Sequence, residues 1–252
     1  MASFLITGSS RGLGLALVSR LAALSPTEVG TIFATARQDN SPQLDELVKA
    51  SAGRVERVTL DVTSPDSIQQ ASREVERRLQ GRGLDYLINN AGVMDWSPAN
   101  LESMDNLDEV FHINVTSVHL VTRAFLPLLR QGEKKMTVNV STTLGSIGWS
   151  HIFKEMPSPA YKVSKAALSM LTVQYDHQYA KEGLSFLAIS PGWLRTDLGG
   201  SRADLPVEVG AEKVVDLVQK ASPEDSGKFW NIHVPGWEDS PRDPYHGGQV
   251  PW

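Results

Sequence analysis

Residues 3–14 read SFLITGSSRGLG, an apolar segment followed by a glycine-rich one. The first five residues are mostly apolar, as in a buried strand, and Gly8, Gly12 and Gly14 follow them. Glycine lacks a Cβ, so the backbone turns sharply here and a pyrophosphate can approach the N–H groups at the start of a helix. The stretch therefore predicts a strand, a dinucleotide-binding turn and a helix. An ordinary strand-to-helix turn remains the alternative for this motif taken alone.

The same alternation of strand and helix continues along the chain. The predicted strands are residues 3–7, 31–36, 55–61, 84–89, 136–141, 184–190 and 227–234, and the predicted helices are 13–24, 43–50, 65–79, 107–129, 159–179 and 207–219. This order predicts βαβ units and a parallel sheet, and strands that are apolar throughout indicate helices on both faces. The predicted fold class is α/β: one Rossmann-type, doubly wound parallel sheet of about seven strands, in a single domain over residues 1–252.

Composition narrows the function. The formal net charge is −5, which argues against binding nucleic acid, and there is no polybasic run to suggest a membrane contact. No apolar run approaches the roughly 20 residues of a membrane span. The chain has no cysteine, so it forms no disulfides, and its first strand begins too early to leave room for a signal peptide. We therefore expect a cytoplasmic protein. The six histidines form no HExxH motif, so we expect no metal site.

The end of the second predicted strand indicates the type of dinucleotide. An NAD enzyme usually places an acid there to hold the ribose 2′-hydroxyl. Here the strand ends in ATAR, residues 34–37, without an acid at its tip. Arg37 and Arg11 are placed to face a 2′-phosphate, which suits a guanidinium group, so we predict NADP(H). Two solvated surface arginines are the alternative, and the nearby Asp39 complicates the argument.

Further polar residues stand at the carboxyl ends of strands, where such sheets bind ligands. Asp61 either accepts a hydrogen bond from the adenine amino group or caps the next helix. NNAG (89–92) follows the fourth strand, and PGWLRT (191–196) is placed to hold the nicotinamide amide. The predicted cofactor-binding residues are Gly8, Ser10, Arg11, Gly12, Leu13, Gly14, Arg37, Asp61, Val62, Asn90, Ala91, Gly92, Tyr161, Lys165, Pro191, Gly192, Leu194 and Thr196.

Tyr161 and Lys165 are candidate catalytic residues. They are four apart, so a helix puts them on one face. Hydride transfer to a carbonyl creates an alkoxide that needs a proton donor, and a neighbouring ammonium lowers the pKa of a phenol from about 10. An exposed helical pair is the alternative. The fifth strand ends in the hydroxyls of Ser141 and Thr142, which either polarise a carbonyl or cap backbone groups.

Asn114 lies in the middle of a predicted helix, where asparagine is unfavourable. It either positions a water molecule near Lys165 or makes a hydrogen bond between helices.

Together these motifs resemble those of the short-chain dehydrogenase/reductase family, in the family's order and over nearly the whole chain. The matching segments are TGSSRGLG (7–14), DV (61–62), NNAG (89–92), Asn114, VNVST (138–142), YKVSK (161–165) and PGWLRT (191–196). The segments 197–215, 225–229 and 247–252 resemble the C-factor/sniffer-like carbonyl reductase subgroup. The resemblance implies an NADP(H)-dependent oxidoreductase that interconverts a small-molecule carbonyl and an alcohol, working as a homodimer or homotetramer.

The resemblance also implies roles for the site residues. Tyr161 is the general acid/base, Lys165 binds the ribose and lowers the tyrosine pKa, and Asn114 belongs to a proton relay. The family's catalytic serine is usually the second of a Ser-Ser pair, three residues before a glycine. Counting back from Gly145 gives Thr142. Alternation along the strand also favours Thr142 over its neighbour, and which of the two hydroxyls acts is left open.

Two other functions fit the same fold: a non-catalytic NADP(H)-binding sensor or scaffold, and an isomerase or pericyclase that leaves the cofactor unchanged. Tyr161 and Lys165 argue against the sensor, whereas Thr142 in the serine position leaves it open.

Two segments are longer than in most family members. Residues 143–160 are expected to cover the mouth of the substrate site. Residues 237–252 are expected to form an ordered but irregular extension held by Trp237, Tyr245 and Trp252, because their prolines and glycines argue against a regular helix or strand.

Overall fold

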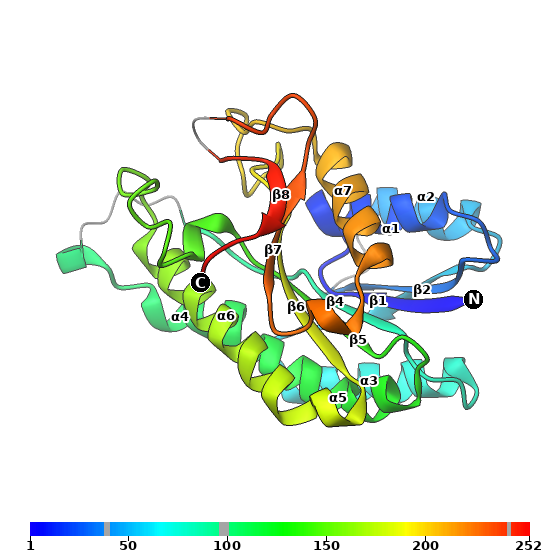
Figure 1. The fold of residues 1–252 in the computed structure, drawn as a ribbon. Coiled ribbons are helices and arrows are strands. Elements are labelled where there is room, and N and C mark those ends of the chain that lie inside the picture. The colour runs from blue at the N-terminus through cyan, green and yellow to red at the C-terminus, as the bar shows by residue number, and fades with distance from the viewer. Residues whose placement is uncertain (38–40, 96–100, 241–242) are drawn as a thin grey trace.

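A single sheet forms the centre of the molecule (Figure 1). The computed structural model describes residues 1–37, 41–95, 101–240 and 243–252. The strand order is β3-β2-β1-β4-β5-β6-β7-β8, in which β1 to β7 run parallel and β8 is antiparallel to β7. The strands are β1 (Ala2–Ile6), β2 (Val29–Ala36), β3 (Val55–Thr59), β4 (Tyr86–Asn89), β5 (Met136–Val140), β6 (Ser185–Ser190), β7 (Phe229–His233) and β8 (His246–Gln249). The predicted α/β class and doubly wound sheet are confirmed.

Helices cover both faces of the sheet (Figure 1). One face carries α1 (Gly12–Ala22), α2 (Pro42–Ala50) and α7 (Val207–Lys220). The other carries α3 (Pro65–Leu79), α4 (Leu107–Phe111), α5 (Ser117–Gln131) and α6 (Pro159–Tyr179). Each face has its own hydrophobic core, and β1 supplies both, since Phe4 and Ile6 enter the first and Leu5 the second. Side chains of a strand alternate between the two faces, which explains this division.

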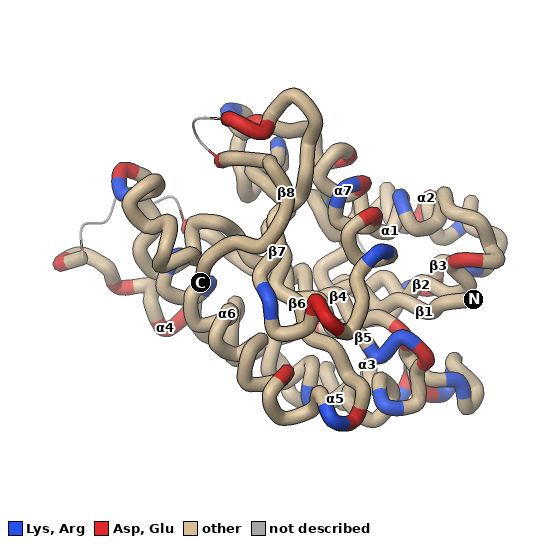
Figure 2. Tube along the Cα trace, viewed as in Figure 1, with Lys and Arg blue, Asp and Glu red and all other residues tan. Residues whose placement is uncertain are grey.

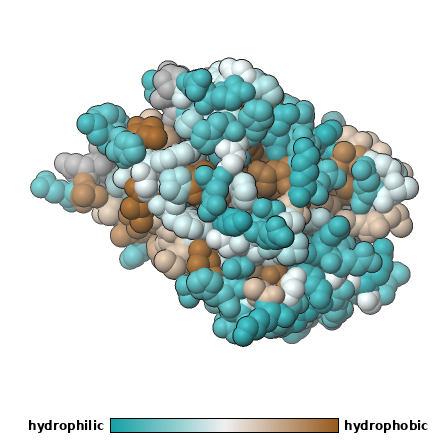
Figure 3. Space-filling view, viewed as in Figure 1, coloured by the Kyte–Doolittle hydropathy of each residue, from teal (hydrophilic) through white to brown (hydrophobic). Residues whose placement is uncertain are grey.

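Charged side chains lie mainly outside the central sheet (Figure 2). Among the eight strands, only the edge strand β3 carries charged residues, namely Glu56 and Arg57, and the remaining charges lie on helices and loops. The face seen in Figure 3 is mostly hydrophilic, with small, separate apolar areas. Within the described part of the chain, no helix has the length and apolar character that crossing a membrane requires.

The predicted helix at 107–129 contains a change of helix type. Between α4 and α5, residues His112–Thr116 form a turn of π-helix, which holds Asn114. Single π-helical turns inside α-helices occur frequently at functional sites, because they re-aim the side chains around them. Pro127 lies within α5 without ending the helix.

The C-terminal tail corrects two predictions, because the sheet has eight strands rather than seven and the tail contains β8. This strand pairs with the edge of β7, and the prolines of the tail lie outside it. Gly247 and Gly248 have φ angles of +72° and +86°, which other residues adopt at a cost in energy. The glycines therefore permit the pairing that their presence seemed to exclude. Next to the strand, Tyr245 is fully buried and Trp252 stacks on Phe229.

Candidate active site

A pocket of about 340 Å³ opens at the carboxyl ends of the parallel strands. This volume lies within the range of about 300–1,000 Å³ that is usual for small-molecule sites. All of the predicted site residues except Asn114 line it. The pocket also receives residues that the sequence did not single out as parts of the site, among them Val93, Met94, Trp193, Asp197 and Asp243.

The turn after β1 packs so closely against neighbouring backbone that it requires glycine at two positions. Gly8 has a φ of +70°, and a Cβ there would lie 3.0 Å from the Cα of Ala91. A Cβ at Gly14 would lie 2.2 Å from the carbonyl oxygen of Gly8. Arg11 precedes α1 without any side-chain capping bond, and Gly12, Leu13 and Gly14 of the first turn line the pocket. Such a helix start favours an anionic group, and the turn fits a dinucleotide pyrophosphate.

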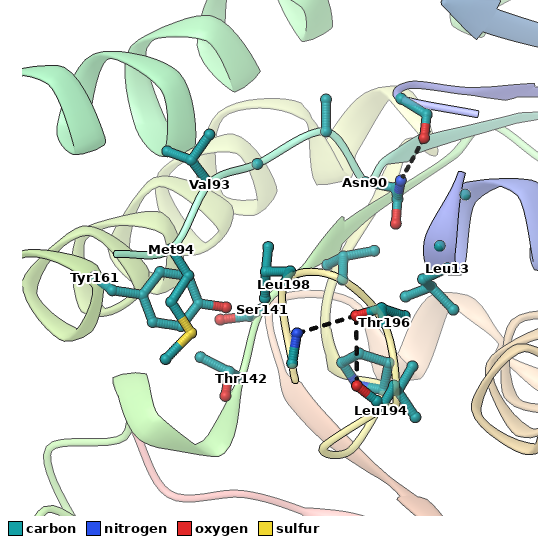
Figure 4. Close-up of a pocket in the computed structure, with 18 of the residues that line it drawn as sticks. Leu13, Asn90, Val93, Met94, Ser141, Thr142, Tyr161, Leu194, Thr196 and Leu198 are labelled. Carbon is teal, nitrogen blue, oxygen red and sulfur yellow. Dashed lines mark hydrogen bonds between the residues drawn. The ribbon is translucent and has the colours of Figure 1, made fainter. Parts of the chain in front are cut away.

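Hydrogen bonds join the NNAG segment (residues 89–92), which follows β4, to this turn. The side-chain amide of Asn90 donates to the carbonyl oxygens of Thr7 and Gly8, at 2.9 and 3.2 Å (Figure 4). In return, the hydroxyl oxygen of Thr7 accepts the backbone N–H groups of Asn90 and Ala91. The side chain of Asn90 therefore shapes the floor of the pocket.

Two arginines stand where a 2′-phosphate was expected. Arg11 and Arg37 are both exposed and line the pocket. The guanidinium of Arg11 is 2.6 Å from the carboxylate of Asp197, and their side chains are 74% and 76% exposed. An exposed pair of this kind contributes little and exchanges readily with solvent, so it leaves Arg11 available to a phosphate. Asp39 lies outside the described residues.

Asp61 does not cap α3. Its carboxylate accepts hydrogen bonds from the backbone N–H and hydroxyl of Thr63, and these bonds hold its pKa below the usual range. The helix is capped by Ser64, whose hydroxyl oxygen accepts the N–H of Ser67. The capping alternative is therefore wrong, and Asp61 lies on the pocket wall with one carboxylate oxygen committed to Thr63.

Tyr161 and Lys165 lie one turn apart on α6 and are both buried, at 8% and 6% exposure. The ammonium of Lys165 donates to the carbonyl oxygen of Val140 at 2.8 Å and lies 5.7 Å from the centre of the Tyr161 ring. Burial raises the pKa of Tyr161 and lowers that of Lys165 to about 8. We expected the ammonium to lower the pKa of the phenol. Among the protein's own groups, however, loss of hydration dominates both values, because it disfavours each charged form.

Two hydroxyls follow β5 in the same pocket (Figure 4). The Ser141 oxygen is enclosed, and no hydrogen-bond partner for it lies among the described residues. Thr142 is partly exposed, and its hydroxyl oxygen accepts the N–H of Leu144 at 3.3 Å. In Figure 4 the Ser141 oxygen is drawn beside the Tyr161 hydroxyl, whereas that of Thr142 points to the other side. Both capping and carbonyl polarisation are therefore open to Thr142.

Asn114 lies behind the pocket and is fully buried. Its side-chain oxygen accepts the N–H of Val93, and its amide donates to the carbonyl of Val93 and to the hydroxyl of Ser164 on α6, all at 2.9–3.0 Å. A hydrogen bond between helices, one of the two predicted roles, is thus present. The same side chain holds the segment after β4 in place, and the water-positioning role stays a prediction.

The loop after β6 completes the cofactor side. Thr196 accepts the N–H of Gly199 at 3.0 Å, which closes the loop on itself (Figure 4). Gly192 has a φ of +83°, and a Cβ there would lie 2.6 Å from the Tyr245 ring. The hydroxyl oxygen of Tyr245 accepts the N–H of Trp193 at 3.2 Å. The tail therefore supports this loop from behind, a contact that no local sequence pattern signals.

Part of the pocket wall is apolar. Met94, Phe153, Met156 and Leu198 line it. The ammonium of Lys162 on α6 donates to the carbonyls of Phe153 and Met156, which holds the 143–160 segment against the helix. Side chains of this segment thus wall the predicted substrate end.

Comparison with known proteins identifies the family. A model of the short chain dehydrogenase family matches residues 3–205. The chain therefore belongs to the short-chain dehydrogenase/reductase family of oxidoreductases, as the sequence motifs predicted.

The chain is similar along its whole length to two solved structures. The NADPH-bound carbonyl reductase from chicken fatty liver is 32% identical, with a TM-score of 0.87 and 94% of that chain covered. The carbonyl reductase Sniffer of Drosophila melanogaster is 27% identical, also with a TM-score of 0.87, and is covered completely. The C-signal protein of Myxococcus xanthus is 32% identical over 170 residues, which span 67% of this chain and 93% of that protein. The predicted resemblance to the C-factor/sniffer-like group is confirmed.

Proposed function

We propose that the protein is an NADP(H)-dependent carbonyl reductase, with Tyr161 as general acid and Lys165 as its helper. The observation that carries the proposal is that this pair lines the same pocket as the dinucleotide-shaped turn and the apolar side chains Met94, Phe153 and Met156. A substrate against these side chains would present its carbonyl to both the tyrosine and the cofactor. Similarity to an NADPH-bound carbonyl reductase supports the same reading.

The residues present fit a dinucleotide. The close-packed glycine turn and the start of α1 would hold the pyrophosphate, Asp61 with Val62 the adenine, and Arg11 with Arg37 a 2′-phosphate. The backbone of residues 191–196 would hold the nicotinamide amide. When bound, the reduced cofactor supplies the hydride that forms the new C–H bond.

The protein supplies the proton and the electrostatic field. Tyr161 gives its hydroxyl proton to the oxygen that gains the carbonyl π electrons. Because burial raises its pKa, the phenol keeps this proton until negative charge develops beside it. Lys165, with a pKa of about 8, is mainly an ammonium at neutral pH and stabilises the phenolate that remains. We assign carbonyl polarisation to Thr142, because Thr142 lines the pocket and its hydroxyl hydrogen can donate while its oxygen accepts the N–H of Leu144.

Replacement of Tyr161 by phenylalanine tests the assignment. The Tyr161→Phe variant should bind NADPH nearly as well as the original protein, because only one oxygen is lost. Turnover should fall by about 10²-fold or more, the usual contribution of a general acid. NADPH titration by fluorescence and steady-state reduction of a ketone and quinone panel measure the two effects. Near-normal turnover in the variant would rule out this mechanism.

A further inference from the structure

The segment that precedes α6 supplies part of the pocket wall but is held together mainly by its own turns. The backbone N–H groups of Ser150, Ile152, Phe153 and Met156 each donate to the carbonyl three residues earlier. Such bonds fix the local shape of a segment without placing it on the rest of the protein. Phe153 and Met156 nevertheless line the pocket, and Phe153 is only 3% exposed. These two side chains therefore need an anchor outside their own turns.

Lys162 is that anchor. It directly follows Tyr161 on α6, and its ammonium donates to the carbonyl oxygens of Phe153 and Met156 at 2.6 and 2.7 Å. A hydrogen bond from a charged donor is stronger than one between neutral groups. Among the described residues, these are the hydrogen bonds that join residues 150–156 to another element of the fold. The wall is thus held by the same helical turn that carries Tyr161.

Ser158 holds a second part of the wall to the same turn. It is 3% exposed, and its hydroxyl donates to the carbonyl oxygen of Asp95, in the segment after β4. Met94, the preceding residue, lines the pocket. The carbonyl oxygen of Ser158 also accepts the N–H of Lys162 at 3.1 Å. Two side chains four positions apart therefore fasten two wall segments to the start of α6.

The backbone at Ser158 is strained. Its φ and ψ angles are +85° and +57°, the left-handed region, which favours glycine over a residue with a side chain. Strain of this kind persists only where the surrounding structure imposes it, and it gathers at functional sites. Glycine would adopt this conformation more easily but would lose the hydroxyl that bonds to Asp95. The strained serine therefore indicates that this hydrogen bond has a use.

We propose that Lys162 and Ser158 are positioning residues that hold the apolar wall in register with the Tyr161 hydroxyl. This inference rests on the proposed reductase function and adds a substrate class to it: ketones with an apolar aromatic arm that reaches the wall. For such a ketone a fixed wall turns contact into orientation of the carbonyl, and a small misplacement is costly. A short ketone that does not reach the wall gains nothing from these residues.

Two methyl ketones, butan-2-one and its phenyl-bearing analogue 4-phenylbutan-2-one, test the role of Lys162. The original protein should have the higher kcat/KM for the aryl ketone. In Lys162→Met this value should fall by about tenfold or more, whereas the value for butan-2-one and the affinity for NADPH should hardly change. Lys162→Arg keeps a charged donor and should restore most of the loss. Lys154→Met removes an exposed lysine of the same segment and should keep the original ratio.

A pair of variants at Ser158 separates positioning from stability. Ser158→Gly and Ser158→Ala both lack the hydroxyl, but only alanine keeps the backbone strain. The glycine variant should therefore melt at the higher temperature of the two, while both lose aryl-ketone activity to the same extent. If the role were merely structural, activity would follow melting temperature. This pair also stands as a test of its own if Lys162→Met does not fold.

Failure of this inference can be told from failure of the proposed function. If the original protein binds NADPH but reduces neither ketone, the proposed function fails, and this inference fails with it. If both ketones are reduced equally well, or the aryl preference survives in Lys162→Met or in both Ser158 variants, the reductase assignment stands and the positioning role is wrong. Activity that follows melting temperature in the Ser158 pair contradicts the role in the same way.

Discussion

The burial of Lys165 has a cost for the folded state. Burial lowers its pKa from 10.5 to about 8, so between these values the unfolded chain holds a proton that the folded protein has released. The contribution of this residue to stability therefore rises with pH across that window and is least favourable below it. A hydrophobic residue would avoid this cost, which agrees with a function for the ammonium rather than a structural role.

At the residue scale, Arg37 decides between the two cofactors. Arg37→Asp should weaken NADPH binding by about 10-fold or more, since a hydrogen bond to a charged group is worth about 1.5–3 kcal/mol, and should move preference toward NADH. Isothermal titration with both dinucleotides measures the change. Asp197→Asn is the control: it removes the exposed partner of Arg11 and should leave NADPH binding intact or stronger. Equal affinity of the original protein for NADH and NADPH would show that the arginines do not select.

The two hydroxyls after β5 give a second residue-scale prediction. Thr142→Val keeps the shape and removes the donor, so kcat should fall by about 10²-fold if that hydroxyl polarises the carbonyl. Ser141→Ala should have the smaller effect, because the Ser141 oxygen is enclosed. Steady-state kinetics of both variants decide between them. If Ser141→Ala is the more damaging change, the Ser141 hydroxyl, drawn beside that of Tyr161 in Figure 4, polarises the carbonyl, and the strand register that favours Thr142 is off by one residue.

Among the helices and strands, those with a clear local sequence pattern are the ones that the sequence predicts correctly. The strands and helices with continuous apolar or amphipathic patterns appear within about two residues of their predicted ends, and α3 and α6 match fully. The π-helical turn around Asn114 was missed because its register depends on bonds to Val93 and Ser164 from other elements. β8 was missed because glycine composition argues against a strand locally, whereas the open edge of β7 makes one possible.

The tail is predicted to be an integral element. Deleting residues 237–252 removes β8, the buried Tyr245 and Val250, and the partner of the Trp193 N–H. Burying each such side chain is worth about 1.5–3 kcal/mol. We therefore expect the melting temperature to fall by about 10 °C or more, at about 2–4 °C per kcal/mol in a chain of this size. Calorimetry and substrate KM measure the effect. An unchanged melting temperature, assembly state and KM would show that the tail is passive.

For the molecule as a whole, the sequence motifs predict which residues line the pocket better than they predict what each residue contacts there. Glycine turns and the Tyr-Lys spacing led to residues that do converge on one pocket, because parallel strands bring their carboxyl ends to a common edge. The sequence does not indicate Asp197 and Asp243 as residues of the site, because their hydrogen-bond partners, Arg11 and Thr143, lie far away in the sequence. The single-domain organisation and a homodimer or homotetramer remain predictions. Large apolar side chains such as Val163 and Met170 are exposed on α6.

In the proposed reaction, hydride passes from NADPH to a carbonyl carbon in this pocket. The most direct measurement uses NADPH carrying two deuterium atoms at nicotinamide C4, with mass spectrometry of the product. We expect one deuterium on the new carbinol carbon for each NADPH consumed, and almost no product with Tyr161→Phe. Product without deuterium and without loss of NADPH would indicate an isomerase, and NADPH binding without any product would indicate a sensor. Either result would contradict the proposed hydride transfer.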